Sequence, residues 1–143
     1  MTNLLQVKKV IVTGASRGIG RAIALCAAQN GAVVGINYLN SKNEAEKLAA
    51  EIDSIGQAKA VLMKFDATKG GEIETALKGF IAGYKTVDGW VNNAAINIPG
   101  LLPALTEDEI RRQIESALTG PVISCRIIIP YMMENRCGSI VNI

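Results

Sequence analysis

The segment 13–20, TGASRGIG, contains three glycines whose spacing suits the binding of a phosphate group. It follows a β-branched run, Lys8–Thr13, and precedes apolar residues at helical spacing, so it is expected to join a strand to a helix. Free amides and the helix dipole favour negative charge at a helix N-terminus, and glycine permits both a tight turn and close approach of the backbone. The segment therefore predicts a site for the pyrophosphate of a dinucleotide. The plainer alternative is that these glycines only let the helix pack closely on the strand.

Several other chemistries are excluded by residue type. The chain contains no histidine, which removes Ser-His-Asp and Cys-His catalysis as well as imidazole metal ligation. Its three cysteines, Cys26, Cys125 and Cys137, are odd in number and never spaced CxxC. Neither a disulfide framework nor a zinc site is therefore indicated.

Runs of β-branched residues alternate with amphipathic segments along the whole chain. We expect strands at 8–13, 32–37, 60–65, 87–91 and 139–143, and helices at 18–30, 41–56, 73–84 and 106–135. This alternation predicts an α/β fold, in which a doubly wound parallel sheet carries helices on both faces. A chain of 143 residues is expected to form one domain, 1–143.

Short signals mark the ends of these helices. Ser41 with Glu44 and Thr106 with Glu109 have the spacing of capping boxes. Gly31 and Gly138 are expected to end the first and the last helix. Pro121 and Pro130 each remove a hydrogen bond inside the last helix, so we expect bends there.

Composition limits the partners. Hydrophobic residues make up 49% of the chain and charged residues 20%, as in globular proteins, and the net charge is +2. That charge is too small to indicate nucleic acid or an anionic membrane as a partner. The best apolar run, Ile127–Met133, contains Pro130 and falls short of the roughly 20 residues of a membrane span. We therefore expect a soluble, cytoplasmic protein.

Together, the motifs resemble those of the short-chain dehydrogenase/reductase family. The glycine motif TGASRGIG is followed in order by Asp66 after the third strand, by NNAA at 92–95 after the fourth, and by GSIVNI at 138–143. The resemblance covers essentially the whole chain and is greatest to 3-oxoacyl-carrier-protein reductases and related sugar-alcohol or steroid dehydrogenases. It implies a Rossmann-like fold with strand order 3-2-1-4-5. It also implies that the chain corresponds to the N-terminal, cofactor-binding part of the family, truncated at its C-terminal end.

The resemblance implies a role for each matching residue. Gly14, Gly18 and Gly20 would line the pyrophosphate, and Ser16 and the backbone of Ile19 would contact phosphate. Asp66, with Ala67 beside it, would accept a hydrogen bond from the adenine amino group. Asn92 and Ala94 would lie beside the adenosine ribose, Asn92 also tying strands together, and Ala95 replaces a more usual glycine near the cofactor.

The choice between NADP and NAD depends on the end of the second strand. An acidic residue there would bind the ribose 2′-hydroxyl of NAD and repel a 2′-phosphate, but Asn37 and Tyr38 occupy this place. Arg17 could pair with a 2′-phosphate, and Ser41 and Lys42 could add donors. We therefore expect NADP rather than NAD. The alternative is that Arg17 and Lys42 are ordinary surface cations.

The acid/base residues of the family have no counterpart in the chain. The family's YxxxK tyrosine and lysine and its carbonyl-binding serine follow the fifth strand, beyond Ile143. The YxxxK at Tyr38–Lys42 is at the adenosine end, so we assign it no catalytic role. Ala117 replaces a family asparagine that supports a proton relay. No catalytic residue is therefore expected among these 143 residues.

The leading interpretation is the NADP-binding part of an oxidoreductase that, when intact, transfers hydride between NADP(H) and a ketone or secondary alcohol. Such a part is not expected to turn over alone. A non-catalytic dinucleotide-binding or oligomerisation module and a nonfunctional remnant are the alternatives. We also expect 139–143 to be an exposed edge strand and Ile127, Ile128 and Ile129 to lack cover. Both features predict a homo-oligomer.

Overall fold

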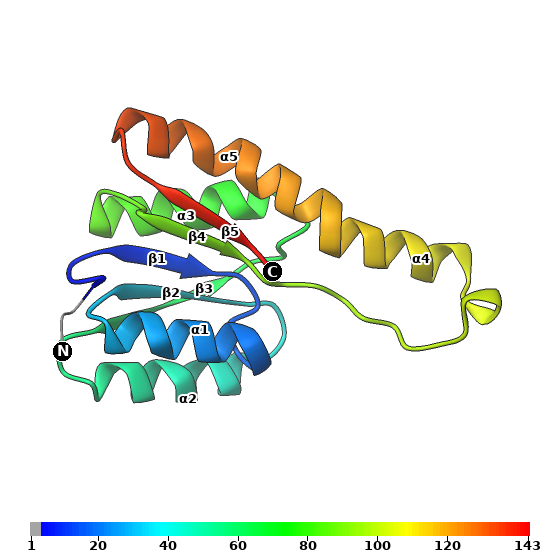
Figure 1. Cartoon of the computed structure of the whole chain (residues 1–143), viewed down its shortest axis with the longest axis horizontal. Helices are drawn as coiled ribbons and strands as arrows, with labels where there is room; N and C mark the ends of the chain where they lie inside the picture. Colours follow the sequence, from blue (N-terminus) through cyan, green and yellow to red (C-terminus); the bar gives the residue numbers. More distant parts are fainter. Residues whose placement is uncertain (1–3) are drawn as a thin grey trace.

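The computed structural model describes residues 4–143 and shows a five-stranded parallel sheet between two layers of helices (Figure 1). The strand order is β3-β2-β1-β4-β5, and every neighbouring pair is parallel. The strands are β1 (Lys9–Val12), β2 (Val33–Tyr38), β3 (Lys59–Lys64), β4 (Gly89–Asn92) and β5 (Ser139–Asn142). The predicted fold class and strand order are confirmed.

The helices form one layer on each face of the sheet. Helices α1 (Gly18–Gln29) and α2 (Lys42–Asp53) lie on one face, and α3 (Gly70–Tyr84) and α5 (Gly120–Glu134) lie on the other (Figure 1). The core under α1 and α2 includes Val12, Ile36 and Leu48, all fully buried. The core under α3 and α5 is built around Trp90 and Phe65, whose rings stack at 6.4 Å.

The strand order reverses next to β1. The chain runs from β1 outward to β2 and β3, then returns to the other side of β1 with β4. In open α/β sheets ligands bind beyond the carboxyl ends of the strands at such a switch point. The segments that follow β1 and β4 meet at this point. They contain the motifs TGASRGIG and NNAA, on which the predicted cofactor site is based.

The last helical segment is continuous but not uniform. Helix α4 (Glu107–Ile114) leads through a π-helical turn, Glu115–Thr119, into α5, and α4 projects beyond the sheet (Figure 1). The amide of Gly120 donates to the carbonyl of Glu115, five residues back. Pro121 has no amide to continue the regular ladder, and the wider turn accommodates its ring. At Pro121, where a bend was expected, the backbone thus forms a π turn. Pro130 lies inside α5, which continues past it to Glu134.

The predicted helix ends are correct in part. Thr106 and Glu109 form the expected capping box. Ser41 is the N-cap of α2, but its side chain makes no capping hydrogen bond and its ψ of 60° is not extended, so that prediction is wrong.

Glycine behaves differently at the two predicted helix stops. Gly31 has a φ of +89° directly after α1, as expected. Helix α5 ends at Glu134 instead of at Gly138, and Arg136 takes the left-handed conformation, with a φ of +50°. Gly138 instead lets the chain pass close to Met132.

Two expectations at the sheet need correction. Strand β4 begins at Gly89 and not at Val87, although Val87 is buried just before it. Ile128 is fully buried against the sheet, because it points from α5 into the core, so only Ile129 of the predicted apolar face is strongly exposed. The exposed edge at β5 is confirmed, since β5 has a partner on one side only among the described residues.

One helical stretch has the length and composition of a membrane span. Among residues 4–143, Glu107–Glu134 is the single candidate; an 18-residue window within it has a mean hydropathy of 1.2, and 28% of that window is buried. This is weak support for a membrane span, because the core helix of a soluble protein passes the same test. Part of this stretch belongs to the core, since Ile128 and Met132 of α5 are buried there.

Candidate cofactor site

The glycine turn joins β1 to α1 in a conformation that few residues adopt. Gly14 and Gly18 have φ values of +61° and +56°, where side chains are disfavoured. Arg17 is the N-cap of α1, and its side chain makes no capping hydrogen bond. The amides of the first helical turn have no partner within a helix, so Gly18, Ile19 and Gly20 present donors at the positive end of the helix dipole.

The three glycines have different neighbours. A Cβ atom on Gly20 would lie 2.5 Å from the carbonyl oxygen of Gly14, and one on Gly14 would lie 3.0 Å from Cα of Ala94. A Cβ atom on Gly18 would have no atom within 4 Å. Close packing therefore accounts for Gly14 and Gly20, whereas Gly18 faces open space. Since a Cβ atom there would occupy that space, the turn fits an anion such as a pyrophosphate.

Asn37, at the carboxyl end of β2, holds the turn in place. Its Oδ1 accepts from the Gly14 amide at 2.9 Å, and its Nδ2 donates to the carbonyls of Phe65 and Met63 at 2.9 and 3.3 Å. The side chain is buried, and its oxygen and both amide hydrogens have partners inside the chain. Asn37 therefore supports the turn and the strand β3 instead of offering a free donor to a ligand.

Thr13 and Asn93 join the glycine turn to the loop after β4, and the sequence reasoning assigned neither a role. The Thr13 hydroxyl donates to the Val91 carbonyl at 3.1 Å and accepts from the amides of Asn93 and Ala94 at 2.9 and 3.0 Å. Asn93 Nδ2 donates to the carbonyls of Thr13 and Gly14 at 2.9 and 3.2 Å. Their place in the sequence could have indicated a role, because Thr13 belongs to the motif TGASRGIG and Asn93 to NNAA.

Asn92 ties β4 to β5, as the resemblance implied. Its Oδ1 accepts from the indole of Trp90 at 2.7 Å, and its Nδ2 donates to Oδ1 of Asn142 at 2.8 Å. Asn92 is buried among these partners. Its side chain thus fixes the carboxyl ends of two neighbouring strands.

The remaining predicted site residues lie around the carboxyl edge. Asp66, directly after Phe65, uses Oδ1 to accept from the amide and hydroxyl of Thr68 at 2.9 and 2.8 Å, which orients its carboxylate. The other predicted residues differ in burial: Ser16 is buried, Ser41, Ala67 and Ala94 are half-buried, and Arg17, Ile19 and Ala95 are exposed. The structure therefore brings the segments after β1, β2, β3 and β4 to one edge of the sheet.

The YxxxK at Tyr38–Lys42 does not present a tyrosine to this edge. Tyr38 is buried in the core beneath α1 and α2. Ala117 is exposed on the π turn, and the buried hydroxyl of the adjacent Ser116 accepts from the Ile96 amide at 2.9 Å. No group of three or more histidine, cysteine or acidic residues among residues 4–143 could hold a metal ion.

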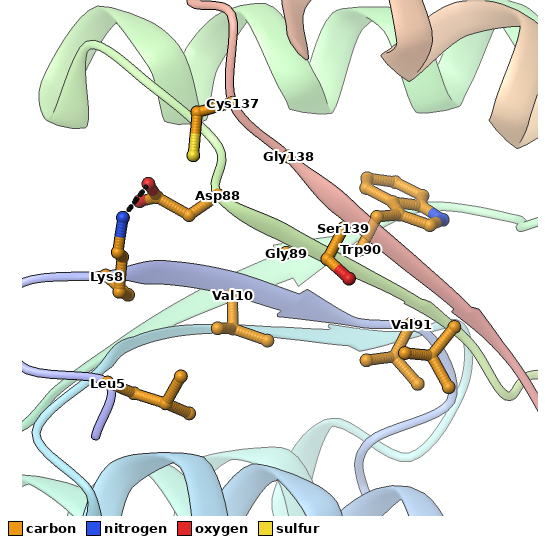
Figure 2. A pocket seen from close by; sticks show the side chains of 11 residues that line it. Leu5, Lys8, Val10, Asp88, Gly89, Trp90, Val91, Cys137, Gly138 and Ser139 are labelled. Carbon is orange, nitrogen blue, oxygen red and sulfur yellow. Dashed lines mark hydrogen bonds and ion pairs between the residues drawn. The ribbon is translucent and has the colours of Figure 1, made fainter. Parts of the chain in front are cut away.

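A well-formed cavity lies elsewhere. It measures about 360 Å³ and is next to the amino ends of β1, β4 and β5, where Lys8, Asp88 and Ser139 contribute to its lining (Figure 2). It is therefore distinct from the glycine turn.

Comparison with known proteins decides the family. A family model described as short chain dehydrogenase matches residues 8–143. The chain belongs to this family. A 3-oxoacyl-[acyl-carrier-protein] reductase of Staphylococcus epidermidis is 37% identical over 136 residues, which cover 95% of the chain and 55% of the relative. The corresponding reductase of Staphylococcus aureus is 35% identical with the same coverage.

Solved structures of family members agree with the fold. A short chain dehydrogenase from Burkholderia cenocepacia in complex with NADP has a TM-score of 0.87 and 30% identity, covering 96% of this chain and 55% of that one. A metagenomic short-chain oxidoreductase in complex with NADP has a TM-score of 0.88 and 29% identity, covering 96% and 62%. The chain thus spans little more than half the length of the relatives that it matches.

Proposed function

We propose that this chain is the NADP-binding part of a short-chain oxidoreductase. The observation that carries the proposal is Gly18, which has a left-handed backbone and open space at the N-terminus of α1, at the switch point of the sheet. Two structural neighbours are NADP complexes, which supports the same ligand here.

The proposed binding residues are those predicted from the sequence, with two changes of role. Asn37 and Tyr38 act by shaping the turn and the core, since their side chains are buried. The pyrophosphate contacts are assigned to Gly14, Ser16, Gly18, Ile19 and Gly20, and the 2′-phosphate contacts to Arg17 and Ser41. The adenine contacts are assigned to Asp66 and Ala67, and the ribose contacts to Ala94, Ala95 and the backbone of Asn92, whose side chain bonds to Trp90 and Asn142.

NADP is favoured over NAD because no acid follows β2 to repel a 2′-phosphate, whereas Arg17 is exposed beside the glycine turn. Guanidinium pairs with phosphate through two parallel hydrogen bonds. Lys42 is a weaker candidate, since it pairs with Glu46 at 3.4 Å.

The bound cofactor would supply the hydride for reduction of a ketone or oxidation of a secondary alcohol. The relatives that are named 3-oxoacyl-[acyl-carrier-protein] reductases make a 3-oxoacyl thioester the first substrate class to test. Tyr38, the tyrosine of the YxxxK sequence at Tyr38–Lys42, is buried and so offers no proton donor at the described edge. We therefore propose that these 143 residues bind the cofactor without catalysing turnover by themselves.

A second candidate is a non-catalytic dinucleotide-binding or oligomerisation module. The exposed strand β5 favours it, because an unpaired sheet edge can pair with another chain. Self-association into a homo-oligomer is part of the proposal in either case. We also propose a cytoplasmic location, in keeping with the three free cysteines of the described chain.

Fluorescence titration of the purified chain with NADPH, and in parallel with NADH, tests the cofactor proposal. We expect saturable binding that is tighter for NADPH. Arg17→Ala should weaken NADPH binding about tenfold, equivalent to about 1.4 kcal/mol, and leave NADH unchanged. Arg112→Ala, which removes an exposed cation on α4, is the matched control. Absence of binding for both cofactors up to about 1 mM, an affinity of about 4 kcal/mol, would overturn the proposal.

A further inference from the structure

The loop 93–98, which follows β4, is attached to the helical segment that begins with α4. The chain leaves β4 and runs beside this segment before it turns back into α4 (Figure 1). The hydroxyl of Ser116 accepts from the Ile96 amide at 2.9 Å, and Oε1 of Gln113 accepts from the Ile98 amide at 3.2 Å. Residues three apart lie on one face of a helix, and amides two apart point the same way in an extended chain. The two spacings match, so one helix face holds two amides of the loop.

Ser116 is fixed in the orientation that this contact requires. Its hydroxyl donates to the Gln113 carbonyl at 3.0 Å, which leaves the lone pairs of the oxygen for the Ile96 amide. Only 6% of Ser116 is exposed, and loss of the hydroxyl would leave a partly buried amide without its acceptor. The adjacent Ala117 is exposed and has no polar side-chain group. Ser116 is thus the π-turn residue that carries the bond to this loop.

The π turn itself, Glu115–Thr119, lies at the carboxyl edge of the sheet. The Oε1 atom of Glu115 lies 3.6 Å from Nζ of Lys69. A Cβ atom on Gly120, which follows the turn, would lie 2.8 Å from the carbonyl oxygen of Ala67. Both ends of the π turn therefore contact the segment that follows β3, where the adenine contacts are proposed.

The other end of the loop is fixed at the glycine turn. The Thr13 hydroxyl accepts from the amides of Asn93 and Ala94 at 2.9 and 3.0 Å. Between the two anchors lies Ala95, which is exposed and whose amide has no hydrogen-bond partner within residues 4–143. The anchors thus hold the loop on both sides and leave the backbone of Ala95 open to a ligand.

We propose that Ser116 and Gln113 are positioning residues, which hold the loop after β4 as one wall of the site for the nicotinamide half of the cofactor. A dinucleotide binds across the switch point of a doubly wound sheet. The adenine contact proposed at Asp66 follows β3 on one side of β1, so the nicotinamide half extends over β4 on the other side. Ser116 and Gln113 act there through the backbone of Ile96 and Ile98. The inference rests on the proposed binding of NADP.

Two ligands distinguish the halves of the cofactor. The compound 2′,5′-ADP has the adenosine and the 2′-phosphate but lacks the nicotinamide half, so a change confined to the loop should not affect its binding. Isothermal titration calorimetry of the purified chain measures both affinities. Ser116→Ala is expected to weaken NADPH binding about fivefold and to leave 2′,5′-ADP binding unchanged.

Ser54→Ala is the matched control. The Ser54 hydroxyl donates to the carbonyl of Glu51, three residues back, as Ser116 does to Gln113. Ser54 follows α2 at the end that precedes β3, away from the carboxyl edge of the sheet. Both ligands should therefore bind this variant as they bind the parent chain.

Gln113 provides an independent test, which also applies if Ser116→Ala fails to fold. Gln113→Met removes the acceptor for the Ile98 amide and should weaken NADPH binding about threefold relative to 2′,5′-ADP. Gln113→Glu keeps an oxygen acceptor and should restore the ratio of the two affinities to that of the parent chain.

The outcomes separate this inference from the proposed function. A parent chain that binds neither ligand would refute the proposed function, and the positioning role with it. A parent chain that binds NADPH, together with variants that weaken both ligands equally, would show a merely structural role and refute the inference alone. Unchanged NADPH affinity in Ser116→Ala and Gln113→Met would do the same.

Discussion

Gly18 and Gly20 are two residues apart, yet an added methyl group would have different consequences at each. At Gly20 it would collide with the Asn93 amide and the Gly14 carbonyl, whereas at Gly18 it would meet nothing within 4 Å. A substitution at Gly20 therefore tests packing. A substitution at Gly18 tests what the turn binds.

Gly18→Ala is expected to weaken NADPH binding about tenfold, because the methyl group enters the open space beside the free amides. The positive φ also makes alanine cost about 1 kcal/mol of folding free energy. Gly56→Ala is the matched control, since Gly56 has a φ of +81°, no atom within 4 Å, and a position remote from the turn. Both variants should lose similar stability in chemical denaturation. Equal NADPH affinity in the two would contradict the assigned role of Gly18.

Asn93→Ala is expected to lower the free energy of unfolding by about 1–2 kcal/mol. It removes two hydrogen bonds to the carbonyls of Thr13 and Gly14, which are partly buried. Urea denaturation measures the change, with Asn43→Ala at an exposed position of α2 as the control. A loss no larger than in the control would show that Asn93 does not fix the turn.

At this scale the sequence predicts a good part of the site. The glycines and Asp66 belong to a local motif or directly follow a strand, so their spacing indicates their place. Thr13 and Asn93 bond to each other's segments across 80 residues, and residue type alone does not reveal such a partner. The sequence likewise places Asn37 near the ribose, and only its three hydrogen-bond partners show that it supports the turn.

Among the elements, α4 depends on its capping box more than on packing. No residue of α4 is buried, and the box at Thr106 and Glu109 satisfies two backbone amides at its start. The Thr106 backbone amide, and then its hydroxyl, hold the pKa of Glu109 below its usual value by donating to the carboxylate. This contribution is therefore fully present above pH 4.5 and is lost as the pH falls through the lower pKa of the folded chain.

Amide hydrogen exchange across α4 measures this effect. We expect protection of the Thr106 amide, which donates to the Glu109 carboxylate, to fall as the pH is lowered from 4.5 through the lower pKa of the folded chain, after correction for the intrinsic exchange rate. Glu109→Gln, which cannot titrate, should show a flat profile over the same range. Parallel profiles in the two proteins would mean that the carboxylate does not control the helix end.

Element types were easier to predict than element boundaries. The short apolar runs predicted all five strands, and the reason is clearest for β1 and β2, because parallel strands buried on both faces need such residues. The π turn at Glu115–Thr119 was not predicted, since proline forbids a regular ladder without specifying how the backbone adapts. Ser41 failed as a capping-box residue because the local backbone, not residue type, decides whether its hydroxyl reaches an amide.

The whole molecule links cofactor binding to folding. A ligand that binds only the folded chain adds about 2.7 kcal/mol of stability at 100 times its dissociation constant. Saturating NADPH should therefore raise the midpoint of thermal unfolding by several degrees, as followed by circular dichroism. Gly18→Ala should show a smaller rise than Gly56→Ala at the same NADPH concentration. No rise with the parent chain would argue against a folded binding site.

Steady-state assays address the proposed division between binding and chemistry. With NADPH and a 3-oxoacyl thioester, the 143-residue chain is expected to show no turnover while still binding the cofactor. The physical reason is that Tyr38 is buried and provides no acid at the site. Measurable oxidation of NADPH that depends on the thioester would contradict this expectation.

Asn37 has a consequence for the order of folding. Its amide joins the Gly14 amide to the carbonyls of Met63 and Phe65, so the glycine turn and the end of β3 share one side chain. The turn is made early during synthesis, but its geometry is complete only after some fifty further residues have been added and β3 has docked. In a refolding experiment, affinity for a nucleotide should thus recover later than the helical signal of α1. Ligand binding would then report the docking of β3 on β2.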